Sequence, residues 1–386
     1  MIKDKKIRLF AFMQMLLISM LAVSIPALIT TFQKVFQLSI AQSAIIPVIG
    51  TIGGFTVNLI VAKFSAHIGM KRLNQYFLII GFIGALILSF TGNIYIFLFG
   101  VLLVGINTAF GLTTTSTIFA HIKAKYQNYG VFHAFFGIGG IITPAIIGWL
   151  LIQEFDYRYI YWFLALNYFV FLTFVTISGL IENRKYESIK LKEALAIIKK
   201  KFVLPVLILI LFHAGSEQGI VTWSGNLLHD GIGFSLELAA VYLSAYWIIF
   251  TVGRLFVQVV ENKIGKLNSV KLFLSIMITG IALLLITGKP WFFLLTALGV
   301  GPIFPLMQKY SAQKLPEREI GLFNGVVFAA TSIGNVAIGG SMGLVAEYSL
   351  KLSFVIPILA AVISLSIVFY LCKLKRSGVI AVTARV

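Results

Sequence analysis

The sequence predicts an all-α membrane protein with twelve transmembrane helices in two six-helix pseudo-repeats. Three observations predict this fold: 59% of the 386 residues are hydrophobic, only 11% are charged, and the mean hydropathy is +0.98. Soluble domains carry about 25% charged residues, so this chain cannot cover a water-facing surface. The net charge of +18 does not indicate a nucleic-acid binder, because the basic residues lie in short gaps between apolar runs. The single Cys372 can form no internal disulfide.

The apolar runs define the expected helices. A spanning helix needs about 20 apolar residues, and cutting the chain where basic and turn residues cluster gives twelve such runs. The first run follows a lysine-rich start, but it is too long for a signal-peptide core and has no small-residue cleavage pattern. The predicted spans are 8–32, 38–62, 74–91, 94–119, 129–152, 159–181, 202–228, 238–260, 271–288, 290–311, 321–345 and 352–372.

Basic residues predict the orientation of these spans. Lys and Arg in short loops are retained on the cytoplasmic side, and most of the 31 fall in alternate loops if the N-terminus is inside. An even number of spans then places the C-terminus inside as well. We therefore expect a multi-pass protein of the cell inner (plasma) membrane with both termini cytoplasmic.

A polar segment divides the chain into equal halves. Residues 182–201 carry seven Lys or Arg residues between the sixth and seventh spans. We predict an N-terminal half at 1–181, a cytoplasmic linker at 182–201 and a C-terminal half at 202–386. Apolar residues at helical spacing within the linker fit either an amphipathic helix on an anionic leaflet or a solvated linker helix.

The two halves repeat short motifs at a constant distance. Phe55-Thr56-Val57 recurs 195 positions later as Phe250-Thr251-Val252, and Ile138-Gly139 recurs as Ile333-Gly334. Two like-oriented six-helix halves with a solute site near the midplane form a recurring transporter architecture. Further matches are Gly130-Val131 with Gly325-Val326, Gly148 with Gly343 and, at 196 positions, Gly69 with Gly265.

The loop between spans two and three resembles the signature loop of the major facilitator superfamily. Gly69, Lys71 and Arg72 fit that pattern, whereas Ala62 replaces its glycine and Ala66 replaces its aspartate. The resemblance implies that this loop latches the two halves in the outward-facing state. The second copy at 262–266 keeps more of the pattern.

Span five adds two further resemblances. Gly130, Gly139, Pro144 and Gly148 are similar to the glycine-proline motif of the family's proton antiporters, from which Thr143 and Ile147 depart. Small residues with a proline allow close packing and a bend. The stretch 132–139, with 215–219 and Trp223, looks more like the fucose permease branch. That branch implies sugar:proton symport with coupling carboxylates in spans one and four, but both predicted spans here contain none.

Glu217 is the one carboxylate that the predicted boundaries place deep in a span. An ionisable group in the centre of the bilayer costs several kcal/mol, so its presence there indicates a functional or structural role. Burial disfavours the charged form of a carboxylate, and His213 lies one turn earlier on the same helix face. We predict proton coupling through Glu217 and His213. Direct substrate binding and a purely structural role are the alternatives.

Amides and aromatic residues inside the spans predict a solute path. Such groups bind neutral polyols by hydrogen bonds and ring stacking, although each is also a candidate for a helix–helix hydrogen bond. The predicted substrate-binding residues are Gln14, Asn107, Gln218, Trp223, Asn226, Trp247, Asn324, Thr331 and Asn335.

A second set of residues is predicted to act in gating. Arg254 lies within snorkelling reach of the cytoplasmic surface, but the family resemblance also implies a role in the inner gate, and both interpretations stay open. His133 lies one turn into span five, where gating or packing is expected. The predicted gating residues are Gly69, Lys71, Arg72, Gly139, Pro144, His133 and Arg254.

Together these patterns predict a secondary transporter that moves a small polar solute, with a sugar as one candidate, by proton-coupled alternating access. The alternative is a proton-driven efflux antiporter for amphipathic or drug-like compounds. No nucleophile and base occur at a recognisable spacing, so we expect no enzyme. We also expect no metal, no cofactor and no nucleic acid, and a monomer whose partners are its solute, protons and the lipid bilayer.

Overall fold

The computed structural model describes residues 2–120, 122, 123, 126, 129–181, 197–315 and 317–377. The described residues contain twelve helical segments that are long and apolar enough to cross a membrane, which confirms the predicted number of spans. The predicted linker at 182–201 lies outside the described residues as far as position 196. The chain divides into two compact units, Met1–Ser188 with Thr222–Ser244, and Ile189–Val221 with Ala245–Val386.

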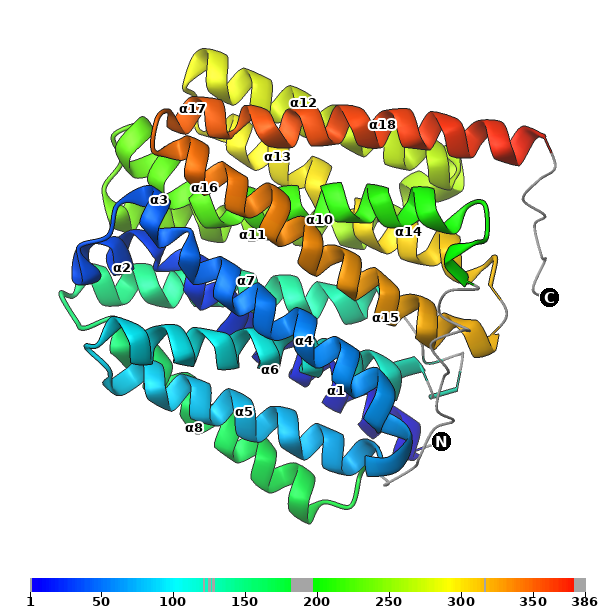
Figure 1. Ribbon diagram of the computed structural model, residues 1–386, viewed down its shortest axis with the longest axis horizontal. Coiled ribbons are helices and arrows are strands. Elements are labelled where there is room, and N and C mark those ends of the chain that lie inside the picture. The colour runs from blue at the N-terminus through cyan, green and yellow to red at the C-terminus, as the bar shows by residue number, and fades with distance from the viewer. Residues whose placement is uncertain are drawn as a thin grey trace. The chain divides into compact units, whose positions relative to one another are not determined.

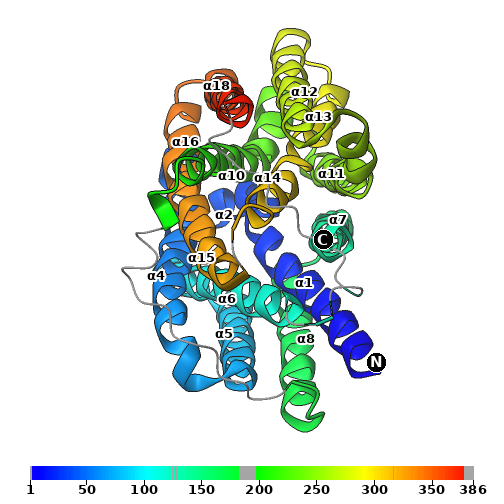
Figure 2. The ribbon, with the colours of Figure 1, turned by 90° about the vertical axis from the view of Figure 1, so that its right-hand side faces the viewer.

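The first unit is built from long helices that lie alongside one another (Figure 1). Within it α1 packs on α7, α4 packs on α6, and α5 packs on both α6 and α8 (Figure 2). The helix α1 ends beyond Pro26, and the span continues as the short α2. The helices are α1 (Ile2–Ala27), α2 (Ile29–Phe36), α3 (Ile40–Ser43), α4 (Ile45–Ile68), α5 (Met70–Phe90), α6 (Ile94–Ala120), α7 (Tyr129–Ile152) and α8 (Arg158–Ile177).

The second half of the chain follows the same order but contains more interrupted spans. Here α12 packs on α13 and α18. A π-helical turn ends the seventh span, and another interrupts the eleventh. The elements are α10 (Val203–Asn226), η2 (Leu227–Gly231), α11 (Leu236–Ile264), α12 (Lys266–Thr287), α13 (Trp291–Val300), α14 (Ile303–Ala312), α15 (Glu317–Gly334), η3 (Asn335–Gly340), α16 (Ser341–Ala346), α17 (Leu350–Ser353) and α18 (Val355–Arg376).

The predicted repeat is visible in the backbone of the two halves. Gly69 immediately precedes α5 with a φ of 83°, and Gly265 immediately precedes α12 with a φ of 79°. This left-handed conformation favours glycine, and it turns the chain sharply between two spans at equivalent places.

Close helix contacts also recur at equivalent glycines. Gly139 of α7 lies against Leu16 and Ser19 of α1, and Gly334 of α15 lies against Leu211 of α10. In each half the fifth span therefore approaches the first span closely at a glycine. A larger side chain at either position would collide with the backbone of the neighbouring helix. The repeated sequence motif encodes a repeated packing contact.

Candidate functional site

The carboxylate of Glu217 lies at the midpoint of the Val203–Gly231 span. Its Oε2 atom is 3.5 Å from Nε2 of His213, one helical turn earlier. The His213 side chain is fully buried, whereas 20% of the Glu217 side chain stays exposed. The structure thus brings the two predicted coupling residues together.

Arg254 of α11 completes this group. Its Nη2 atom lies 3.8 Å from Oε1 of Glu217, and the residue is only 5% exposed. The guanidinium stacks on the ring of Phe250 at 4.1 Å and donates through Nε to the carbonyl oxygen of Gly301 at 2.9 Å. The burial of Arg254 argues against the snorkelling interpretation, because its charge is held by partners inside the protein.

The carbonyl of Gly301 is available because the tenth span is broken. The helix α13 ends at Val300 and α14 begins at Ile303. In a continuous helix this carbonyl would accept from the residue four positions later, but that residue is Pro305, which has no N–H. The freed acceptor fixes the position of Arg254.

Several buried polar atoms near this group have no hydrogen bond to any described residue. They are both ring nitrogens of His213 and the hydroxyl of Tyr246. A buried polar group without a partner costs about 1–3 kcal/mol, so such atoms are uncommon where structure alone is selected. Their presence beside Glu217 and Arg254 is typical of a functional site.

Aromatic rings form one wall of this region. Tyr246 stacks on Phe293 with ring centroids 4.7 Å apart, and Trp247 meets Phe250 edge to face at 4.7 Å. Trp247, a predicted substrate residue, is 3% exposed. The wall holds Phe250, and through it the guanidinium of Arg254, in one orientation.

The amide face predicted on the eleventh span is partly described. With its amide oriented so that the nitrogen faces the two acceptors beside it, Asn335, the first residue of η3, donates to the carbonyl oxygens of Ala214 at 3.2 Å and Thr331 at 3.1 Å. Asn335, Thr331 and Gln218 are half-buried. The side chain of Asn324 lies outside the described residues. The amide of Asn335 thus contacts α10 at Ala214, one turn before Glu217.

Gln14 and Asn107 are buried completely and join helices of the first unit. Gln14 and Asn74 exchange amide hydrogen bonds of 2.8 and 3.2 Å. Asn107 donates to the carbonyl oxygen of Phe77 at 2.7 Å and accepts from the hydroxyl of Tyr168 at 2.6 Å. For these two residues the structure favours the helix–helix alternative over contact with a solute.

We expect Asn107→Leu to destabilise the protein by about 1–3 kcal/mol, because it leaves the buried Tyr168 hydroxyl without its acceptor. Thermal unfolding of the purified protein measures the effect. The double variant Asn107→Leu with Tyr168→Phe should recover part of the loss, since it removes both partners. Equal stabilities of the single variant and the wild type would contradict this assignment.

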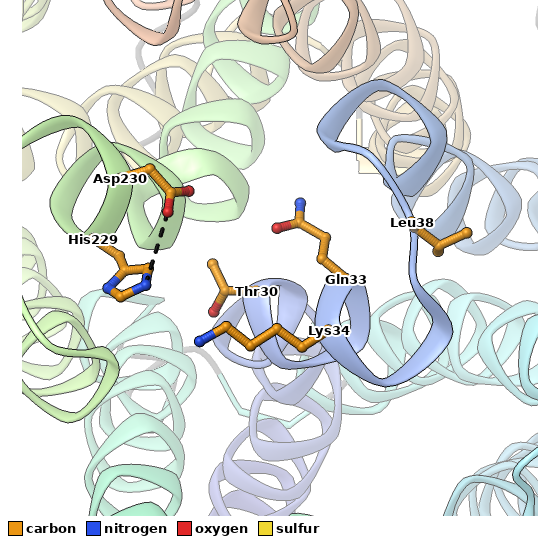
Figure 3. A pocket seen from close by; sticks show the side chains of 6 residues that line it. All are labelled: Thr30, Gln33, Lys34, Leu38, His229 and Asp230. Carbon is orange, nitrogen blue, oxygen red and sulfur yellow. Dashed lines mark ion pairs between the residues drawn. The ribbon is translucent and has the colours of Figure 1, made fainter.

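A second polar cluster lies in the first unit, between α2 and η2. The amide of Asn226 donates to Gln33 at 2.9 Å and to Asp230 at 3.0 Å. Trp223, on the preceding turn of α10, is buried. Beside the cluster is a cavity of about 170 Å³, with α2 residues on one side and the His229–Asp230 pair on the other (Figure 3). It is lined by Thr30, Gln33, Lys34, Leu38, His229 and Asp230.

The predicted gating residues occupy helix ends and close contacts. Lys71 donates to the carbonyl oxygen of Thr176 at 3.2 Å, which joins the start of α5 to the end of α8. The adjacent Arg72 is exposed. Pro144 lies inside α7, and His133 is buried on the same helix beside Phe132, with ring centroids 5.2 Å apart.

Glu261 is a buried carboxylate that the predicted boundaries left out, because they ended span eight at residue 260. The helix α11 continues to Ile264, and Glu261 is only 8% exposed. It pairs with Lys309 at 2.9 Å and Lys266 at 3.4 Å. Glu261 lies in the last turn of α11, so Glu217 remains the carboxylate near the middle of a span among the described residues. The sequence signal that could have identified Glu261 is its position directly before the second copy of the signature loop, at 262–266.

Comparisons with known proteins agree with this architecture. A family model described as Major Facilitator Superfamily matches residues 9–339, and no curated protein matches the chain. A bacterial homologue of the human lysosomal transporter Spinster, inward-facing and unoccupied, has a TM-score of 0.78 at 13% identity over 99% of both chains. Its occupied form gives 0.74 at 14% identity, over 96% of this chain and 97% of that one.

A third solved structure is a variant of the E. coli fucose:proton symporter FucP. It has a TM-score of 0.69 at 12% identity, over 94% of this chain and 98% of that chain. At such identities the three structures demonstrate a shared fold.

Proposed function

The chain belongs to the Major Facilitator Superfamily, and from this premise we propose that it carries a small polar solute across the cell membrane in symport with protons. Its family and fold make it a transporter rather than an enzyme. Alternating access of the solute site to the two sides of the membrane is the mode of transport that we infer.

The observation that carries this proposal is the group formed by His213, Glu217 and Arg254. A carboxylate at the middle of a span is costly as an isolated anion. Here Arg254 at 3.8 Å offsets that cost for the charged form, and burial favours the neutral form. The two forms are thereby brought close in free energy, so that Glu217 can bind and release a proton during a transport cycle.

His213 supports the same role. Its Nε2 atom lies 3.5 Å from the carboxylate, within range to pass or accept a proton after a small rotation. Since neither ring nitrogen has a hydrogen bond to a described residue, the imidazole is free to take part in such an exchange. Glu217 is the proton carrier in this proposal, and His213 assists it.

A sugar is one candidate for the solute. The half-buried Asn335 and Thr331 and the aromatic Trp247 are groups that bind hydroxylated molecules. The fold likeness to a fucose:proton symporter makes sugars a sensible first choice for a screen. Efflux of amphipathic compounds remains the alternative, supported by Pro144 and by the close approach of Gly139 to α1.

Transport by the purified protein in liposomes tests the proposal. With the outside at about pH 6 and the inside at about pH 7.5, a labelled polar solute should accumulate and should leave when a protonophore is added. The screen contains neutral sugars and sugar acids. Extrusion of a dye or drug driven by the same gradient, with no polar solute accumulated, would favour the antiporter alternative.

Orientation is part of the same proposal. Twelve spans are an even number, and the distribution of Lys and Arg supports cytoplasmic termini in the plasma membrane. We further propose that the protein acts as a monomer. A tag at the C-terminus should therefore react with a membrane-impermeant reagent only after the cells are permeabilised, and reaction in intact cells would refute this orientation.

A further inference from the structure

We propose that Arg254 binds the carboxylate of the transported solute, and that this carboxylate and Glu217 compete for the guanidinium. The solute would be a small hydroxylated monocarboxylate, such as a sugar acid or a hydroxy acid. This inference rests on the proposed function and names the substrate class of the same site.

The first argument is the unused hydrogen-bonding capacity of Arg254. A guanidinium carries five N–H donors in one plane, yet a single hydrogen bond, from Nε to Gly301, joins Arg254 to the described residues. The Glu217 oxygen at 3.8 Å is beyond hydrogen-bond distance. The guanidinium therefore has N–H groups beyond the one that Gly301 binds, and a carboxylate matches its geometry with two parallel bonds.

The second argument is that the guanidinium is held in place without Glu217. The freed carbonyl of Gly301 fixes Nε, and Phe250 lies 4.1 Å from the guanidinium carbon. An arginine whose position depends on its carboxylate partner would move when that partner takes a proton. Arg254 keeps two other contacts and stays ready to bind a ligand.

The third argument is charge balance. The titratable or charged side chains of described residues that act on Glu217 are His213 on α10, and Arg254 and Tyr246 on α11. The Gly301 carbonyl, which accepts from Arg254, is neutral. With Glu217 ionised and His213 neutral, the group carries no net charge, and an added anion would remain uncompensated. Protonation of Glu217 leaves one positive charge, which a monoanion neutralises.

The hydroxyl groups of such a solute also find partners. Asn335 and Thr331 lie on one face of the eleventh span and are half-buried, and the Asn335 amide reaches α10 at Ala214. Amide and hydroxyl groups hydrogen-bond sugar hydroxyls. A fixed cation beside neutral polar groups therefore fits a sugar acid better than a neutral sugar.

Binding to the full-length protein in detergent tests the inference, with gluconate, glucuronate and lactate as probes and glucose as the uncharged reference. By calorimetry we expect the wild type to bind at least one of these anions about tenfold or more tightly at about pH 5.5 than at about pH 8. Glu217→Gln should bind that anion equally at both pH values, because a neutral amide does not compete. Arg254→Gln should lose binding, whereas Arg376→Gln, at the exposed end of α18, should match the wild type.

The gain of binding in Glu217→Gln at about pH 8 keeps the test decisive even if Arg254→Gln folds poorly. The inference would be overturned if none of the three anions binds to the wild type. It would also be overturned if Arg254→Gln still binds the anion, or if binding to Glu217→Gln depends on pH as it does in the wild type. If a neutral sugar instead accumulates with the proton gradient, the proposed function stands and this inference fails. If an anion binds as described but a proton gradient drives no uptake, the binding site stands and proton coupling fails.

Discussion

Replacing Glu217 with glutamine should reduce proton-driven accumulation of the solute by about 5- to 150-fold, which corresponds to a coupling free energy of about 1–3 kcal/mol. Glutamine keeps the size and the hydrogen-bonding atoms of the side chain, but it cannot carry a proton. Exchange of labelled for unlabelled solute at equal pH should continue, because the substitution leaves the solute path and Arg254, the proposed contact of the solute, in place. Accumulation and exchange are measured side by side in proteoliposomes.

The matched control is Glu347→Gln, which changes an exposed carboxylate at the end of α16. This variant should accumulate solute as the wild type does. Loss of both accumulation and exchange in Glu217→Gln, with the protein still folded, would indicate a structural or binding role instead of a proton role. Unchanged accumulation would remove Glu217 from the coupling mechanism altogether.

Replacing Gly105 with alanine should destabilise the protein by about 1–3 kcal/mol or more, because the added methyl group has no space. Gly105 of α6 lies against the backbone of Gly50 in α4, whose carbonyl group and Cα atom are the nearest atoms to the place that an alanine Cβ would take. Backbone atoms cannot rotate away as a side chain can, so the two helices must separate. The yield of folded protein and its thermal unfolding temperature should both fall.

Gly325→Ala supplies the control for this prediction. Gly325 also lies inside a helix, but no described atom is within 4 Å of its Cβ position. Alanine should be neutral there, or should stabilise the helix by about 0.5–1 kcal/mol. Equal effects of the two substitutions would show that helix propensity, and not the close contact with α4, governs the response at Gly105.

Much of the architecture could be predicted because lipid imposes a simple rule. A chain in hydrocarbon must satisfy its backbone hydrogen bonds internally, so each apolar run of sufficient length becomes a helix. The twelve spans follow from this rule. The paired glycines 69 and 265 were visible as a repeat, and both occupy the left-handed turn before an equivalent helix.

The polar residues were harder to assign. Gln14 was expected to meet a solute, but its partner Asn74, 60 positions away, satisfies it. Glu261 was overlooked because hydropathy places helix ends only approximately. The role of Gly301 had a signal in the sequence, a proline four residues later, yet nothing in that pattern specified Arg254 as the group that uses the freed carbonyl.

From the amino-acid order alone came the membrane environment, the number of spans, the internal repeat and the choice of Glu217 and His213 as neighbours. These depend on composition and on the helical period, which are local properties. The tertiary structure alone decided that Arg254 joins Glu217 and Gly301, and that Gln14 and Asn107 fasten helices to one another. Such contacts depend on how each helix is rotated against the next, and a hydropathy pattern does not record that rotation.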